Sequence, residues 1–191
     1  VNSASSTFAF VSNVASGERS YLDNIFWNAR SNSTPGGPGN HYAIALSGPG
    51  FTSNYNDLYA TGTDGYVGSF GGNQLTLANW QAATGQDANS KSVDPLFVNP
   101  NGDATTVDLH IMAGSPMIAM ATPVAGITND FDNDTRNPYT TDIGADEQTT
   151  FSVHPVATCT VTKTADSSSA PFGTQTGFVL NLNQPTAPTP L

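Results

Sequence analysis

Residues 23–26 read Asp-Asn-Ile-Phe and residues 56–59 read Asn-Asp-Leu-Tyr, so the chain twice places two polar side chains before an aliphatic and an aromatic one. In a stacked β-solenoid, short strands turn apolar residues inward, and Asn or Asp fits tight bends that need left-handed backbone angles. The two segments are therefore interpreted as equivalent points on successive coils. An antiparallel sandwich would accommodate the same strands, and two imperfect copies leave both architectures open.

Short apolar runs on either side of these segments predict further strands, because turn-forming residues separate them. The runs lie at 8–11, 25–27, 42–46 and 55–59, and a loop rich in Pro and Gly fills 31–40. Residues 75–84 instead predict a helix, with Leu77 and Trp80 on one face and Gly85 at its end. Since an open sheet edge invites unwanted pairing, we interpret this helix as part of a cap.

The composition favours strands and restricts the partners. The 191 residues include 18 Gly and 13 Pro, and fifteen acidic side chains against five basic ones give a formal net charge of −10. This charge argues against nucleic acid as a partner, because a phosphate backbone would be repelled. No stretch approaches about 18 consecutive apolar residues, so no membrane span is expected. The acidic, lysine-poor composition predicts an extracellular or bacterial cell-surface location.

A succession of more specific motifs fills residues 75–147. The helix is followed by Val93-Asp94-Pro95-Leu96-Phe97, Asp108-Leu109-His110-Ile111, Gly114-Ser115-Pro116, Asp130-Phe131-Asp132-Asn133-Asp134-Thr135-Arg136 and Asp142-Ile143-Gly144-Ala145-Asp146-Glu147. This succession resembles the C-terminal end of secreted bacterial right-handed parallel β-helix proteins. The resemblance implies an all-β chain, with a right-handed parallel β-helix (solenoid) and a short capping helix in residues 1–147.

Residues 148–191 then form a strand-rich extension with a Pro-rich tail. Two strand-like runs, at 153–164 and 178–182, are too few for an independent domain, so they need a partner in their own chain or in a neighbouring copy. Cys159 in the first run is the single cysteine, which permits no internal disulfide. The chain begins at Val1 without Met, which is typical of a processed protein or a fragment.

The resemblance does not select an activity, since similar ends occur in surface adhesins, repeat-rich secreted proteins and polysaccharide-degrading enzymes. We expect a non-catalytic extracellular or cell-surface protein, such as a stalk, an adhesin or a self-assembling component. Its partners would be other copies of itself, cell-surface proteins or polysaccharide. The alternatives are a polysaccharide lyase or hydrolase and a carbohydrate-binding module.

An enzyme of this kind would need a base and carboxylic acids. The cations of the first strands are Arg19 and Arg30, and the nearby acids are Asp23, Asp57 and Asp64. Turn aspartates also bond to the backbone without any catalytic role, so no residue is assigned as catalytic.

Asp130, Asp132 and Asp134 stand at alternate positions and could present oxygen ligands to Ca²⁺. Arg136 supplies a structural alternative, because its guanidinium can pair with carboxylates in a capping loop. Apart from calcium, no cofactor is expected.

Aromatic side chains offer a possible sugar-stacking face, formed by Trp27, Tyr42, Tyr55 and Tyr59. Alternation along the strands also directs some of these rings into the core. The three histidines, His41, His110 and His154, have no spacing that brings two of them together. Zinc is therefore not expected, and each histidine is interpreted as structural.

Overall fold

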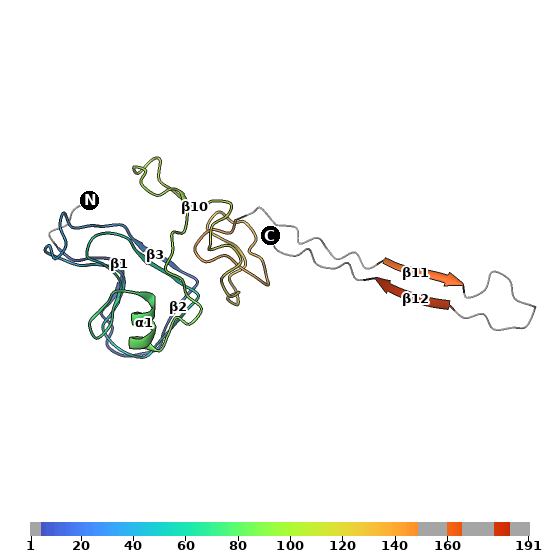
Figure 1. The fold of residues 1–191 in the computed structure, drawn as a ribbon, viewed down its shortest axis with the longest axis horizontal. Helices are drawn as coiled ribbons and strands as arrows, with labels where there is room; N and C mark the ends of the chain where they lie inside the picture. Colours follow the sequence, from blue (N-terminus) through green and yellow to red (C-terminus); the bar gives the residue numbers. More distant parts are fainter. Residues whose placement is uncertain (1–4, 149–159, 166–177, 184–191) are drawn as a thin grey trace, which may run out of the picture. The chain divides into compact units, whose positions relative to one another are not determined.

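The computed structural model describes residues 5–148, together with the backbone of residues 160–165 and 178–183. The chain divides into two units, Val1–Thr150 and Phe151–Leu191 (Figure 1). The elements of the first unit are β1 (Thr7–Ser12), β2 (Arg19–Leu22), β3 (Ile25–Asn28), β4 (His41–Leu46), β5 (Phe51–Asn54), β6 (Asp57–Ala60), β7 (Gly65–Ser69), β8 (Asn73–Gln74), α1 (Leu77–Thr84), β9 (Phe97–Asn99) and β10 (Asp108–Ile111).

In the second unit, β11 (Thr160–Ala165) pairs antiparallel with β12 (Phe178–Asn183). The rest of the predicted strand at 153–164, together with His154 and Cys159, lies outside the described residues, as does the Pro-rich tail. That this hairpin needs a partner stays a prediction. No helix in the described part of the chain is long and apolar enough to cross a membrane.

Parallel pairing dominates the first half of the chain. β4 lies between β1 and β7, and β8 joins β7 in the antiparallel sense. Two further sheets contain one parallel pair each, β2 with β5 and β3 with β6. Later in the chain, β9 and β10 form a short antiparallel pair.

The predicted right-handed parallel β-helix is wrong. The described residues form small separate sheets of short strands, and none of these sheets closes or continues as a solenoid. After β6, parallel pairing continues as an isolated bridge between Asp57 of β6 and Lys91, and not as a further strand of the described residues. Pro95 and Pro100 follow, and neither has the N–H group that a further ladder requires. The parallel ladders therefore stop at Lys91.

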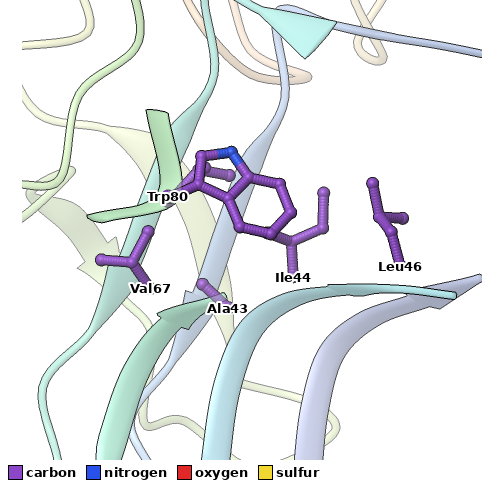
Figure 2. Close-up of a cluster of buried hydrophobic side chains, with 6 residues drawn as sticks. Ala43, Ile44, Leu46, Val67 and Trp80 are labelled. Carbon is purple, nitrogen blue, oxygen red and sulfur yellow. The ribbon is translucent and has the colours of Figure 1, made fainter. Parts of the chain in front are cut away.

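Helix α1 occupies most of the segment predicted at 75–84 and packs on β7 and β8. Its N-cap is Thr76, whose side chain accepts a hydrogen bond from the Asn79 N–H, and it ends at Gly85, which has a φ of 67°. Trp80 of this helix is fully buried. It belongs to the same buried cluster as Ala43, Ile44, Leu46 and Val67, and Figure 2 shows its indole beside Ile44.

A second apolar cluster joins the irregular segments after residue 96 to the strands. Its buried members are Ile111, Met117 and Ile143, and Ile25 of β3 and Phe97 pack against it. Because Ile25 also belongs to the β3–β6 sheet, this cluster holds the later segments of the unit against its first half. The candidate site described next lies on these later segments.

Candidate functional site

Two carboxylates flank the imidazole of His110. Asp108 precedes His110 by two positions on β10, so both side chains lie on the same face of the strand. Asp108 Oδ1 lies 2.5 Å from His110 Nδ1 and also accepts the His110 backbone N–H at 3.0 Å. On the other side of the ring, Nε2 contacts Oδ2 of Asp132.

Asp130 shapes the loop that carries Asp132. Its Oδ1 accepts the backbone N–H groups of Asp132 and Asp134 at 3.0 and 2.8 Å. Its Oδ2 accepts the N–H of Glu147 at 3.0 Å. The loop therefore has a defined shape that brings Asp132 to His110, and the Phe131 ring lies 5.1 Å from the imidazole between centroids.

Asp146 completes the group, which we call the His110 cluster: Asp108, His110, Asp132 and Asp146. Asp146 is 7% exposed, and its Oδ2 accepts the N–H of Ile111 at 2.8 Å. Three potential ligand atoms, one each from His110, Asp132 and Asp146, all lie within 4.8 Å of one another. The His110 cluster is thus the place where three segments meet: strand β10, the loop around Asp130 and the segment before Gln148.

The charges of the cluster affect one another. Hydrogen bonds to Asp132 and then to Asp108 raise the pKa of His110 to about 9. The hydrogen bonds that His110 donates lower the pKa of Asp108. Burial raises the pKa of Asp146, although the Ile111 N–H and the charge of His110 act in the opposite direction. A protonated imidazole is therefore stable here, and the carboxylates outnumber it.

The three predicted calcium ligands have different surroundings. Asp130 is engaged with backbone N–H groups, Asp132 contacts His110, and Asp134 is exposed. Arg136 does not pair with any of them: it donates to Glu147 Oε2 at 3.4 Å and to the Gly144 carbonyl at 2.8 Å. Calcium binding by the three aspartates stays a prediction.

Of the four predicted sugar-stacking residues, the structure brings two together. Trp27 on β3 lies directly opposite Tyr59 on β6, and its ring is 5.8 Å from that of Phe97. Tyr42 is buried in the β1–β4–β7–β8 sheet and donates to Asn73 Oδ1 at 2.7 Å. Tyr55 lies in the turn before β6, with a φ of 55°. Sugar binding stays a prediction, and Trp27 and Tyr59 are its best-placed pair.

A hollow of about 620 Å³ lies beside Trp27. Phe8 of β1 and Arg30 also line it, with residues 100–102 on another side. The Arg30 backbone N–H bonds to Asn28 Oδ1. Two aromatic residues and the exposed Arg30 thus line the same hollow.

Apart from the exposed Arg30, the charged residues that an enzyme would use on the first strands are engaged within the fold. The Arg19 guanidinium donates to the carbonyls of Val14, Gly48 and Pro49 at 2.6 to 2.9 Å. Asp64 accepts the side-chain amide of Asn32 at 2.7 Å. Asp23 and Asp57 likewise accept backbone N–H groups, from Thr122 and Val93 respectively.

The spacing of the histidines did not predict the grouping of His110 with Asp132 and Asp146. The alternation of Asp108 and His110 on a strand was the one available signal. His41, in contrast, is buried beside Thr7 and Asn32, as expected of a structural histidine. No protein family model, curated protein or solved structure matches this chain. The resemblance to secreted bacterial proteins therefore has no matched relative to support it.

Proposed function

We propose that this chain is a non-catalytic structural protein of the cell exterior. The observation that carries the proposal is the internal use of its charged groups. Arg19, which a lyase would need as a free base, is held by three backbone carbonyls. Asp64 accepts a hydrogen bond from Asn32 and Asp23 accepts one from the Thr122 N–H, so both carboxylates have partners within the fold.

The same groups have a clear structural purpose. Loops with little regular structure leave many backbone N–H and C=O groups without strand partners, and such groups must be satisfied when they are buried. Side chains such as Arg19 and Asp130 meet this need. The location is supported by the composition alone: an acidic, lysine-poor chain is typical of secreted bacterial proteins.

Incubation with acidic and neutral polysaccharides tests the non-catalytic role. We expect no release of reducing or unsaturated ends above the level of a buffer control. Turnover that the Asp57→Ala variant abolishes would overturn the proposal, provided that the variant keeps the circular dichroism spectrum of the parent.

A second candidate function is carbohydrate binding in the hollow beside Trp27. Aromatic rings supply apolar area to a sugar face, and a guanidinium group donates hydrogen bonds to its hydroxyls. A glycan array with the full chain would show binding that weakens at least tenfold in Trp27→Ala. The control is Tyr139→Ala, since Tyr139 is 86% exposed and does not line this hollow. Equal loss in both variants, or an array without signal, would exclude this function.

A further inference from the structure

We propose that the His110 cluster binds one divalent metal ion of the zinc type, through His110 Nε2 and one carboxylate oxygen each from Asp132 and Asp146. Imidazole nitrogen and carboxylate oxygen are both ligands of Zn²⁺, and three protein ligands with water in the fourth position complete a tetrahedral site. The three ligand atoms lie within 4.8 Å of one another. In a tetrahedral zinc site such atoms are about 3.4 Å apart, so small rotations of the exposed Asp132 side chain suffice.

The contact between Asp108 and His110 provides an argument independent of the ligand set. Histidine ligands of metals almost always donate their second ring N–H to a carboxylate or a carbonyl. His110 Nδ1 has such a partner, Asp108 Oδ1 at 2.5 Å. Nε2 shares its proton with Asp132 Oδ2 in the metal-free chain. A bound ion would replace that proton while Nδ1–H stays on Asp108, so that Nε2 and the Asp132 oxygen would both become ligands.

The burial of Asp146 is a second argument. This carboxylate is more than nine-tenths buried and has a single hydrogen bond, from the Ile111 N–H to Oδ2. A buried carboxylate is costly unless it is paired or coordinates a metal. The nearest cation, His110, is shared with Asp108 and Asp132, so three carboxylates surround one imidazole. A dication would compensate the excess negative charge.

The surroundings allow an ion to enter and favour zinc over calcium. A hollow of about 500 Å³ is lined by Asp108, His110 and Phe131, which gives solvent access to the imidazole. Calcium takes about six to eight oxygen ligands, whereas a site centred on an imidazole nitrogen suits zinc and its neighbours in the transition series. This site shares Asp132 with the predicted calcium set but does not use Asp130 or Asp134.

A bound ion would join three segments that are distant in the sequence. Asp132 is 22 residues from His110, and Asp146 is 35 residues from its hydrogen-bond partner Ile111. Metal binding would therefore stabilise the folded chain against unfolding, in proportion to the excess of free metal over its dissociation constant. The inference does not depend on the proposed function, since it would hold for an enzyme as well.

Calorimetric titration of the chelator-treated full chain with ZnCl₂ tests the proposal. We expect one Zn²⁺ per chain and a rise in melting temperature on zinc addition. His110→Ala and Asp132→Asn should each weaken binding at least 100-fold, and Asp108→Asn about 10- to 100-fold, as second-shell changes do. Asp134→Asn, which changes an exposed aspartate of the same loop, should leave the dissociation constant unchanged.

Two results would overturn the inference. One is a parent chain that binds no Zn²⁺; the other is zinc binding that His110→Ala and Asp132→Asn leave intact. A CaCl₂ titration runs in parallel. Calcium binding in place of zinc, lost in Asp134→Asn but kept in His110→Ala, would support the three-aspartate calcium site instead. Near-ultraviolet circular dichroism of each metal-free variant shows whether it is folded, and the exposed Asp132 is the change least expected to unfold the chain.

Discussion

The indole nitrogen of Trp80 donates a hydrogen bond to Asp87 Oδ2 at 2.7 Å, and both side chains are buried. The other oxygen of Asp87 accepts hydrogen bonds from Ser53, Asn56 and Ser90 at 2.6 to 3.0 Å. One carboxylate therefore links helix α1 to the turn between β5 and β6 and to the segment that follows the helix.

Removal of this carboxylate should be strongly destabilising, because four donors would lose their acceptor in a buried site. We expect Asp87→Ala to lower the free energy of unfolding by about 3 kcal/mol or more. Urea denaturation followed by tryptophan fluorescence measures the change. The control Asp134→Ala removes an exposed carboxylate and should stay within about 0.5 kcal/mol of the parent. Similar midpoints for the two variants would contradict the role of Asp87.

Gly68 on β7 leaves room for the Trp80 ring. A Cβ atom at this position would lie 2.3 Å from a carbon of the indole, which is far inside van der Waals contact. We expect Gly68→Ala to lower the free energy of unfolding by about 1–3 kcal/mol, as overpacking does. Ser69→Ala, at the next position on the same strand, is the matched control. A Gly68→Ala variant as stable as the control would show that the ring moves aside without cost.

The stability of the chain should depend on pH through Asp57. This carboxyl is fully buried, its Oδ2 has no hydrogen-bond partner, and burial raises its pKa to about 7. The unfolded pKa is near 3.8. The folded state thus favours the protonated form, and this contribution is complete below about pH 4 and is lost as the pH rises through about 7.

Between pH 4 and pH 8 the free energy of unfolding should therefore fall less in Asp57→Asn than in the parent. At pH 8 the difference between the two declines should be on the order of 3 kcal/mol. Melting temperatures at unit pH intervals for the parent and the variant give the difference. Asp134→Asn, a change of an exposed acid that is not among the groups shifting the Asp57 pKa, should keep the slope of the parent. A variant with the same slope as the parent would show that the Asp57 carboxyl does not titrate in this range.

Arg136 and Glu147 form a largely buried ion pair, with 10% and 7% of their side chains exposed. Arg136→Ala should cost about 3–5 kcal/mol, because it leaves a buried carboxylate without its charge partner. In the double variant with Glu147→Gln, the cost of losing Arg136 should be smaller, and a double-mutant cycle by urea denaturation measures the coupling. Fully additive effects would show that the Gly144 carbonyl, and not Glu147, is the important partner of Arg136.

Apolar runs predicted the strands well, whereas their register could not be predicted. The runs at 8–11 and 42–46 lie within β1 and β4. Matching residues 23–26 with 56–59 places Asn24 opposite Asp57. In the structure Ile25 lies opposite Asp57, so the predicted alignment is wrong by one residue. Asn24 instead bonds to Asn56, with its N–H 2.9 Å from Oδ1. Because both turns contain adjacent polar residues, hydrophobicity does not distinguish the two alignments, and the amide hydrogen bonds decide between them.

The β-helix prediction rested on the motifs of residues 75–147, a region with little strand. The aspartates of these motifs include acceptors for backbone N–H groups, as Asp130 and Asp142 are. Such roles depend on how loops close, which local pattern does not reveal. The same holds for the His110 cluster, since Asp132 and Asp146 reach His110 only after two loops have folded.

The spacing of the parallel strands has a consequence for how the chain acquires its structure. Hydrogen-bonded partners such as Thr7 with His41 and Asn24 with Asn56 are 34 and 32 residues apart. Contacts of this kind form only after long loops have closed, and proteins dominated by them fold on the order of milliseconds to seconds. Among the described strands the partner of β1 is β4, so during synthesis this pair forms only after His41–Leu46 has left the ribosome. Its unpaired edge is then open to other chains, so a factor that delays aggregation should raise the yield of folded protein.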